Sequence, residues 1–391
     1  FNSAREIWFE ILDAQIETGT PYIMFKDHCN QKSNQQNLGT IRGSNLCCEI
    51  VEYSSPEETA VCTLASISLP ACVQNGVFNF DDLKKIATLV TKNLNRTIDV
   101  NSYPIPSAKV SNMKHRPIGI GVQGLADVFQ MLNLPYDSEK ARKLNKNIFE
   151  TIYYGALSQS IEIAKKDGHY DSFLGSPFSR GITQIELWGG AEGGDERHNW
   201  SELRANLIKY GCRNSLLTAP MPTASSAQIM GNTESFEPRT SNLYTRRVLS
   251  GEYIVINRFL QEKLNRLGIW NDKMSHLLIE HRGSIQNIKG IPKHVKEVFK
   301  TVWEISQRSV IEMAADRGRY IDQSMSMNLH IEEATRAKLT SAHFLSWKKG
   351  LKTACYYLRT RPKVKAIQFT VKTERQKIME IEADSCESCS A

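Results

Sequence analysis

The segment that most constrains this chain is residues 44–49, Ser-Asn-Leu-Cys-Cys-Glu, which is followed by a further cysteine at Cys62. Asn45, Cys47 and Glu49 are spaced two residues apart, and in an extended segment alternate side chains point to the same side. One face would then carry an amide that can hold a hydroxyl, a thiol, and a carboxylate that can act as a general base. The thiol can serve as nucleophile, reductant or hydrogen-atom donor, and Cys62 could bring a second sulfur to the same site.

The same spacing also fits a half-buried strand whose cysteines are small core residues. By the alternation, Cys48 faces away from the side that Cys47 occupies, and we interpret Cys48 as a packing residue. The residues alone leave the catalytic and the structural interpretation of this segment open.

Length and composition exclude several classes of protein. With 391 residues the chain can form two or more domains or one large α/β unit. Its 41% hydrophobic and 23% charged residues are typical of a globular protein, and nine cysteines, an odd number, argue against a secreted disulfide scaffold. A net charge of +7 does not by itself indicate nucleic acid, but it suits phosphorylated substrates. No apolar run approaches the roughly 18–20 residues of a membrane span, and we expect a cytoplasmic protein that binds neither membranes nor nucleic acid.

Apolar periodicity and capping residues predict the secondary structure. The run 18–21, which contains a glycine and a proline, should end the first helix, and Ser138 should cap the long helix that follows it. Helices are expected at residues 4–17, 81–95, 138–166, 201–210, 251–267 and 292–317, and residues 331–357 should be a helix that leads into a tyrosine pair. Extended segments are expected at 214–219 and 366–371, and the chain after residue 372 should be mobile.

Residues 119–124 contain Gly-x-Gly-x-x-Gly, the pattern of a dinucleotide-binding turn. A proline and only a very short apolar run precede the pattern, and no clear βαβ unit surrounds it. A nicotinamide-dependent dehydrogenase is therefore a weak interpretation of this segment.

Residues 216–229 indicate a strand, a turn and the start of a helix. Thr223, Ser225 and Ser226 place hydroxyls beside the free N–H groups of the first helical turn, an arrangement that binds phosphate. An ordinary threonine or serine helix cap is the alternative interpretation.

Three further patterns bear on chemistry. Tyr356 and Tyr357 are adjacent, and such pairs are usually aromatics of the core and its rim. Cys386 and Cys389 form a Cys-x-x-Cys near the end of the chain. The absence of a second such pair argues against a zinc site. A close dithiol on a flexible arm instead suits thiol–disulfide exchange. The nine histidines show no ligand spacing, and we expect no metal site in this chain.

The run Ser-Asn-Leu-Cys-x-Glu-Ile-Val-Glu-Tyr, followed by Val-Cys-x-Leu-Ala-Ser, closely resembles the active-site loop of the large subunit of class I ribonucleotide reductase. The resemblance runs over essentially the whole chain and includes the tyrosine pair, the run 245–251 and the final dithiol. It also includes a loop that holds the substrate diphosphate in the family and that corresponds here to Pro222, Thr223, Ala224, Ser225 and Ser226. The chain departs from the family pattern at Cys48, usually threonine, at Phe236, usually aliphatic, and at Ala354-Cys355, usually Gly-Met.

The resemblance implies an α/β fold, namely part of a ten-stranded α/β barrel with the reactive cysteine on a finger loop. Residues 1–75 would hold the end of the first half-barrel and the finger loop, and 76–250 the second half-barrel with the phosphate loop. Residues 251–371 would form a C-terminal helical region with the tyrosine relay, and 372–391 a flexible redox tail. In this interpretation the glycines of 119–124 allow close packing at a strand-to-helix turn.

The implied activity is reduction of ribonucleoside diphosphates to 2′-deoxyribonucleoside diphosphates by a cysteine thiyl radical. A separate di-metal small subunit would supply the radical through Tyr357 and Tyr356 to Cys47. Glu49 would take the 3′-hydroxyl proton, and Asn45 would hydrogen-bond the substrate. Cys62 and a partner thiol would become a disulfide.

The family's tail dithiol, here Cys386 and Cys389, reduces that disulfide and is regenerated by thioredoxin or glutaredoxin, and the full-length enzyme is expected to be a homodimer. This chain should bind no cofactor, and ATP or deoxynucleotide effectors should bind regions upstream of residue 1, together with the missing first half-barrel. We therefore expect the isolated chain to be inactive and poorly soluble until an N-terminal half is added. The alternative is a non-catalytic fragment that keeps the fold and binds the small subunit or nucleotide.

Overall fold

The computed structural model describes residues 3–190 and 197–361, so the strand expected at 366–371 and the cysteines Cys386 and Cys389 lie outside the described residues. The chain divides into two compact units. The first contains residues up to 240 and residues 297–360, and the second contains residues 241–296.

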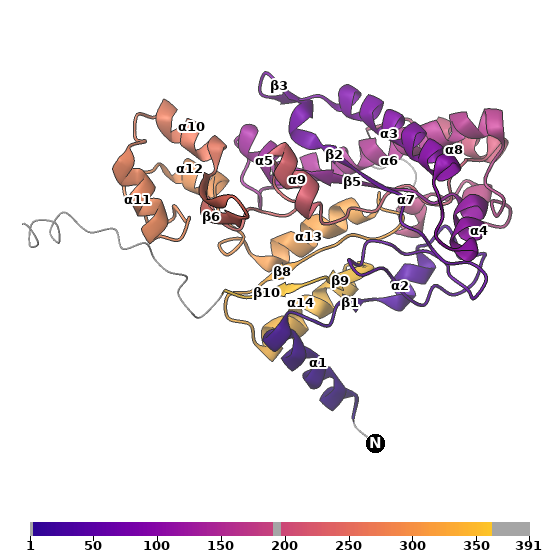
Figure 1. The fold of residues 1–391 in the computed structure, drawn as a ribbon, viewed down its shortest axis with the longest axis horizontal. Helices are drawn as coiled ribbons and strands as arrows, with labels where there is room; N and C mark the ends of the chain where they lie inside the picture. Colours follow the sequence, from indigo (N-terminus) through magenta and orange to yellow (C-terminus); the bar gives the residue numbers. More distant parts are fainter. Residues whose placement is uncertain (1–2, 191–196, 362–391) are drawn as a thin grey trace, which may run out of the picture. The chain divides into compact units, whose positions relative to one another are not determined.

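The first unit contains most of the helices and strands (Figure 1). Its helices are α1 (Ala4–Thr18), α2 (Lys26–Gln31), α3 (Phe80–Val100), α4 (Pro106–His115), α5 (Leu125–Met131), α6 (Glu139–Asp167), α7 (Gln184–Leu187), α8 (Trp200–Tyr210), α9 (Ala224–Met230), α13 (Gln307–Gly318) and α14 (Arg336–Lys348), with 3-10 turns at Leu69–Cys72 and Phe178–Arg180. Its strands are β1 (Ile23–Met24), β2 (Leu64–Ser68), β3 (Val73–Gln74), β4 (Val77–Phe78), β5 (Gly119–Gln123), β8 (Leu329–His330), β9 (Thr353–Cys355) and β10 (Leu358–Arg359).

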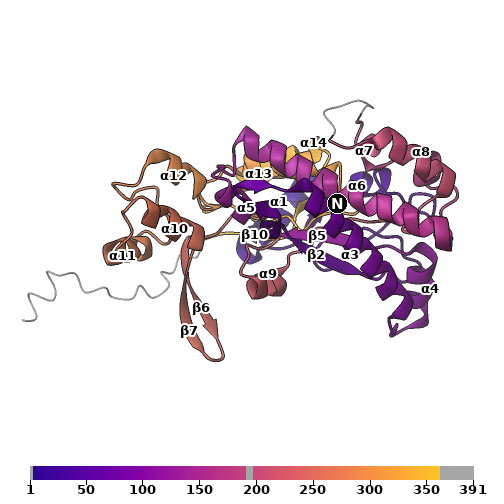
Figure 2. The same cartoon turned by 90° about the horizontal axis from the view of Figure 1, so that it is seen from above.

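Parallel pairing of β2 with β5 forms the centre of this unit. Their register runs from Leu64 opposite Gly119 to Ser68 opposite Gln123, and Thr218 adds a parallel bridge to Ile120. All five residues of β5 are buried, as expected for a parallel strand covered on both faces. Helices α3 and α6 pack against each other beside these strands (Figures 1 and 2). The α/β organisation expected from the sequence is therefore present.

The expected helix ends are confirmed where a capping residue defines them. Ser3 and Glu6 form a capping box at the start of α1, and Gly19 ends that helix in the left-handed conformation. The Ser138 side chain accepts a hydrogen bond from the N–H of Ala141 and so begins α6.

Two expected helices are wrong as single elements. Residues 251–267 instead form strand β7 (Gly251–Ile256) and helix α10 (Arg258–Arg266), because the Asn257 side chain caps α10 and the β-branched residues before it pair with β6 (Leu243–Val248). Residues 292–317 form α12 (Lys293–Val298) and α13, with a non-helical segment between them. Similarly, the helix expected from residue 331 begins only at α14, where Thr335 caps it.

The second unit is built on the antiparallel hairpin β6–β7, which Figure 2 shows as two adjacent strands. Its helices are α10, α11 (Asp272–Glu280) and the start of α12. Leu260, Leu264, Met274 and Leu278 supply its buried apolar side chains from α10 and α11.

The glycine pattern of residues 119–124 lies at the turn from β5 into α5. A Cβ atom at Gly121 would approach the Met221 sulfur to 2.7 Å, and one at Gly124 would approach Pro70 to 2.6 Å. Close packing therefore explains these glycines. The expectation that no βαβ unit surrounds them is wrong, because the parallel strands β2 and β5 are joined through α3 and α4.

No helix in the described part of the chain combines the length and the apolar character needed to span a membrane.

We predict that Gly124→Ala destabilises the fold more than Gly76→Ala. Both glycines have a left-handed φ, +80° and +75°, so alanine is strained at either position by roughly 1–2 kcal/mol. Only Gly124 lacks space, and overpacking there should cost about 1–3 kcal/mol more. Urea unfolding of both variants measures the difference, and equal losses of stability would show that the contact with Pro70 does not constrain this turn.

Candidate active site

The segment around Cys47 is a turn, so the expected alternation along an extended strand is wrong. Cys48 has a left-handed φ of 66°, and its N–H donates to the Asn45 carbonyl at 3.3 Å. The Asn45 side-chain oxygen accepts from the Ile50 N–H at 3.2 Å and closes the turn. Asparagine commonly holds backbone in this way, which explains why residues 45–50 do not extend. Cys48 is 2% exposed, in agreement with its interpretation as a packing residue.

A serine that the sequence analysis missed contacts both Cys47 and Glu49. The Ser326 hydroxyl donates to the Cys47 carbonyl at 2.6 Å and lies 3.2 Å from Glu49 Oε2. The N–H of Ser324 donates to the Glu49 carbonyl at 2.9 Å. Glu49 is buried and Cys47 is partly exposed, and the same short segment, residues 324–326, contacts both residues. Alternation of serine and methionine over residues 324–327 was the signal that could have indicated this segment.

The tyrosine pair lies against the same thiol. The Tyr356 hydroxyl donates to Cys47 Sγ at 3.6 Å, and the Tyr356 and Tyr357 ring centroids are 4.4 Å apart. Desolvation, followed by the hydrogen bond with Cys47, raises the pKa of Tyr356 well above its usual value. Tyr356 is therefore a neutral phenol that keeps its proton at neutral pH. The structure places the three residues of the expected relay in one continuous row.

Hydrogen bonds from their backbone N–H groups fix the tyrosine pair to the segment that carries Ser326 and leads into β8. The Tyr356 N–H donates to the Met327 carbonyl at 2.7 Å, and the Tyr357 N–H donates to Asn328 Oδ1 at 3.2 Å. In addition, the Thr353 hydroxyl donates to the Cys48 carbonyl at 3.0 Å. The positions of the tyrosines and of the cysteine turn are thus set by the same short segment.

Cys62 lies within electrostatic reach of this group. Its side chain is exposed, and desolvation followed by the influence of Glu52, Glu49 and Cys47 raises the pKa of the Cys62 thiol to about 12. Glu52, which the sequence analysis also missed, is buried, and burial raises its pKa to about 8. Its Oε2 atom has no hydrogen-bond partner among the described residues. At neutral pH this part of the site holds a protonated thiol beside a largely protonated carboxyl group.

The expected phosphate loop begins at a strained residue. Thr223 has a left-handed φ of 58°, and its hydroxyl accepts from the Ser235 N–H at 2.8 Å without capping α9. The alternative interpretation, an ordinary threonine cap, is therefore wrong for Thr223. Within α9 the Ala227 N–H is the first to reach a carbonyl, that of Thr223, and Ser225 and Ser226 are exposed. The Ser226 hydroxyl donates to the Thr223 carbonyl at 3.4 Å, so the exposed Ser225 hydroxyl and the first N–H groups of the helix remain for an anion, and Pro222 and Ala224 complete the turn.

Ser326 also connects the phosphate loop to the cysteine turn. Its N–H donates to the Pro220 carbonyl at 3.1 Å, while its hydroxyl holds the Cys47 carbonyl. Two parts of the chain that the sequence analysis assigned to one substrate are therefore tied to a single residue.

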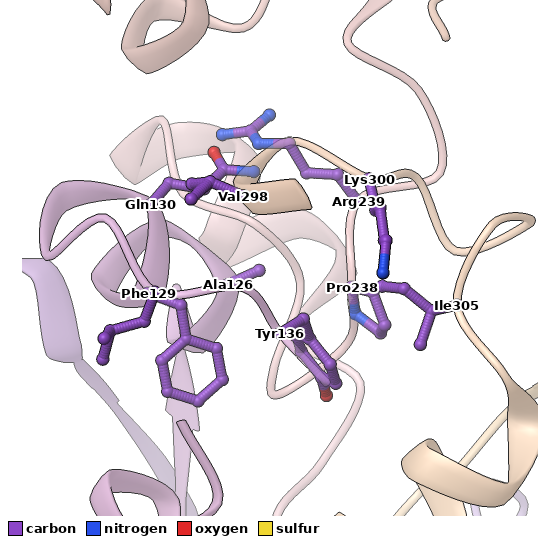
Figure 3. Close-up of a pocket in the computed structure, with 10 residues that line it drawn as sticks. Ala126, Phe129, Gln130, Tyr136, Pro238, Arg239, Val298, Lys300 and Ile305 are labelled. Carbon is purple, nitrogen blue, oxygen red and sulfur yellow. The ribbon is translucent and has the colours of Figure 1, made fainter. Parts of the chain in front are cut away.

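A separate small pocket lies beside α5 (Figure 3) and does not belong to this site. Its cationic groups are already paired, Arg239 with Asp127 at 2.6 Å and Lys300 with Asp137 at 2.8 Å. Within the described residues, no group of three or more His, Cys, Asp or Glu side chains is placed to hold a metal ion.

Comparison with known proteins identifies the family to which this chain belongs. The model of the family "Ribonucleotide reductase, barrel domain" matches residues 2–357. The chain belongs to this family, which confirms the fold expected from the sequence.

Individual relatives agree with this assignment. The chain is 56% identical over 377 residues to the ribonucleoside-diphosphate reductase large chain 2 of Saccharomyces cerevisiae, covering 95% of this chain and 43% of that protein. It is 54% identical over 390 residues to the large subunit from Arabidopsis thaliana, covering 95% of this chain and 48% of that protein. The solved alpha subunit of a class Id ribonucleotide reductase from Actinobacillus ureae matches with a TM-score of 0.72 and 28% identity, over 91% of this chain and 61% of that one. The chain spans about half the length of the curated relatives that it matches.

We predict that Cys62 reacts slowly with an alkylating reagent at pH 8 although its side chain is exposed. A pKa raised to about 12 leaves little thiolate until the pH approaches that value. The rate of labelling should therefore keep rising above the pH at which an ordinary cysteine is already fully ionised. The more basic thiolate is the better nucleophile, and the net effect should be roughly ten- to hundredfold slower labelling than in urea. Mass spectrometry of the labelled peptide measures both rates. Equal rates in the folded and the unfolded chain would contradict the assigned environment of Cys62.

Proposed function

We propose that this chain carries the reactive half of a ribonucleotide reductase catalytic subunit and takes part in reducing ribonucleoside diphosphates to 2′-deoxyribonucleoside diphosphates. The observation that carries the proposal is the hydrogen bond from the Tyr356 hydroxyl to Cys47 Sγ, with the tilted ring of Tyr357 in contact behind Tyr356. Few other functions require a row of two phenols that ends on a thiol.

In the proposed relay each step moves one electron and one proton. An oxidant on a separate di-metal small subunit removes an electron and the phenolic proton from Tyr357. Tyr356 then restores both to Tyr357, and the Cys47 thiol restores both to Tyr356, so that an S–H bond breaks and an O–H bond forms. The 3.6 Å contact between Tyr356 and Cys47 and the neutral state of Tyr356 support transfer of the proton together with the electron.

At the substrate, the Cys47 thiyl radical abstracts the hydrogen atom from the ribose 3′ carbon. Glu49 accepts the 3′-hydroxyl proton, and Ser326 orients its carboxylate. The Asn45 side-chain oxygen is engaged in the turn, which leaves its amide nitrogen to donate to a substrate hydroxyl. The 2′-hydroxyl leaves as water, and Cys62 with a partner thiol supplies two electrons and becomes a disulfide.

The diphosphate is proposed to bind at the start of α9. Residues 222–226 offer the N–H groups of the first helical turn and the exposed hydroxyl of Ser225, which suit an anion, with the Ser226 hydroxyl beside them donating to the Thr223 carbonyl. The link from Ser326 to Pro220 supports a pose in which the phosphates lie on this loop while the ribose reaches Cys47.

Further parts of the proposal concern partners and organisation. A small subunit supplies the radical, and the catalytic subunit acts as a homodimer in the cytoplasm. Thioredoxin or glutaredoxin regenerates the tail dithiol Cys386 and Cys389, and ATP or deoxynucleotide effectors bind outside this chain. Residues 1–75 act as the finger loop and its approach, 76–250 as the second half-barrel, 251–371 as the C-terminal region and 372–391 as the redox tail.

A second candidate function is a non-catalytic fragment that binds the small subunit or nucleotide. This candidate is considered because the chain covers only part of the length of each relative. The contacts of Tyr356 with Cys47 and of Ser326 with Glu49 favour the catalytic proposal, since a fragment that only binds has no need of them.

We predict that Cys47→Ser abolishes nucleoside diphosphate reduction, whereas the neighbouring Cys48→Ser retains most of it. Serine is nearly isosteric with cysteine, but its O–H bond is too strong to be broken by a tyrosine relay, and Cys48 is a buried packing residue. Both variants are assayed in the full-length chain with a small subunit and reductant. Turnover in the Cys47 variant would remove this residue from the radical role.

We predict that replacing both Cys386 and Cys389 with serine stops repeated turnover with thioredoxin after the first reduction. A small dithiol that enters the site directly should partly restore it. The measurement is product formed per enzyme in each reductant. Unchanged thioredoxin-supported rates would show that the tail dithiol is not a shuttle.

A further inference from the structure

The side chain of Asn328 contacts the main chain of Tyr357. Its amide oxygen accepts from the Tyr357 N–H at 3.2 Å. The next residue, Leu329, donates its N–H to the Tyr357 carbonyl at 3.0 Å, in the strand β8 that pairs parallel with β10 (Figure 1). Both main-chain polar groups of Tyr357 are thus held by two consecutive residues, one of them through its side chain.

Glu237 holds the other side of the same amide. Its Oε1 atom accepts from the Asn328 side-chain nitrogen at 3.3 Å and from the Asn328 backbone N–H at 3.1 Å. Because this oxygen is an acceptor, the NH₂ group of the amide turns toward it and the amide oxygen turns toward the Tyr357 N–H. Without an acceptor at position 237 the amide could turn over, and its NH₂ group would then face a second donor.

Burial of the Glu237 carboxyl group lowers the stability of the fold. The residue is 9% exposed, and its Oε2 atom has no hydrogen-bond partner among the described residues. An unpaired polar atom in the interior is costly, so a carboxyl group at this position requires a role that an apolar side chain could not fill. Burial raises the pKa of Glu237 to about 7, and the unpaired Oε2 can carry the proton, so Oε1 accepts from Asn328 in both charge states.

The segment before Glu237 is itself fixed at two points. The Ser235 N–H donates to the Thr223 hydroxyl of the phosphate loop at 2.8 Å. The ring of Phe236 lies under the Arg317 guanidinium, whose central carbon is 4.1 Å from the ring centroid. An aliphatic residue at position 236 would not offer the aromatic face that attracts a cation. The main chain of this segment is therefore held in place, and Glu237 can set the orientation of a partner.

We propose that Glu237 and Asn328 are positioning residues of the radical relay. Glu237 orients the Asn328 amide, the amide fixes the main chain of Tyr357, and the adjacent Tyr356 is thereby held against Cys47. This inference rests on the proposed function. The Tyr356 hydroxyl lies 3.6 Å from Cys47 Sγ, so a small shift of the tyrosine pair would break this contact, and misplaced reacting groups react far more slowly. Neither positioning residue gains or loses an electron or a proton in the relay.

The test exchanges the donor and the acceptor of this pair in the full-length enzyme with its small subunit. Glu237→Leu removes the acceptor, and Asn328→Asp alone sets two carboxyl groups against each other at pH 8. Each should lower the radical yield at position 356 about two- to twelvefold, the effect of one net hydrogen bond. When Glu237→Gln is combined with Asn328→Asp, the amide donates to the carboxylate, whose second oxygen still accepts from the Tyr357 N–H. The yield should then return.

Two measurements separate positioning of the relay from a general loss of structure. A more easily oxidised tyrosine analogue at position 356 traps the radical after it has passed Tyr357, and electron paramagnetic resonance gives its yield per folded enzyme. Equilibrium binding gives the dissociation constant for a ribonucleoside diphosphate. This constant should not change in any variant, because the hydrogen bond between Ser235 and Thr223 does not involve the exchanged side chains. Glu237→Gln alone keeps an accepting oxygen and should keep the radical yield.

Glu150→Leu is the matched control. Glu150 is also buried, and its Oε2 atom likewise has no partner among the described residues. Its Oε1 atom accepts from the His198 N–H at 3.2 Å and from the Trp200 side chain at 3.1 Å, at the start of α8. This variant should lower the stability of the fold and leave the radical yield unchanged.

The outcomes distinguish this inference from the proposed function. An unchanged yield in Glu237→Leu, or a yield that stays low in the exchanged pair, would overturn the positioning role alone. If the leucine variant does not fold, the comparison of Asn328→Asp with the exchanged pair decides. Absence of radical at position 356 in the enzyme that carries only the analogue would instead overturn the proposed function, and this inference with it.

Discussion

A buried ammonium group holds together the segments that form the site. Lys352 Nζ donates to the carbonyls of Asp322 and Gln323 at 2.6 and 2.7 Å and to the Gln184 side chain at 2.9 Å. Burial lowers the pKa of Lys352, and the nearby Asp322 acts to raise it. An unpaired cation in this interior would be costly, so the carbonyls must gather around it. The turn that precedes Ser324 and the strand that leads to Tyr356 are thereby fixed to each other.

The contacts of the site extend from this point. The turn at residues 321–323 continues into the segment whose serines hold Glu49 and Cys47, while Lys352 leads directly into β9 and the tyrosines. Gln323 adds a further connection, since its side-chain oxygen accepts from the Val51 N–H at 3.0 Å and its nitrogen donates to the Ile118 carbonyl at 3.1 Å. The cysteine turn, the parallel strands and the tyrosine pair are therefore joined by hydrogen bonds to one short segment of the chain.

Features encoded by neighbouring residues were easier to predict from the sequence than the geometry of the candidate site. The motif around Cys47 and the capped helices were identified because each is encoded by neighbours in the chain. The left-handed Cys48 was missed, since the strand interpretation ignored the capacity of Asn45 to hold a turn. Ser326 acts 279 positions away from Cys47, a pairing that no local periodicity encodes. Strand β7 of the hairpin was mistaken for part of a helix, although its β-branched residues favoured a strand.

The double role of Ser326 has a consequence for selectivity. One residue fixes both the strand that enters the phosphate loop and the turn that presents the sulfur. The span between an anion on α9 and the Cys47 sulfur is therefore a set length in the folded chain. Under the proposed function, the distance between the phosphate loop and the Cys47 sulfur sets the length of nucleotide that fits the site. A ligand with one phosphate too few or too many places its ribose out of register with the thiol, whatever base it carries.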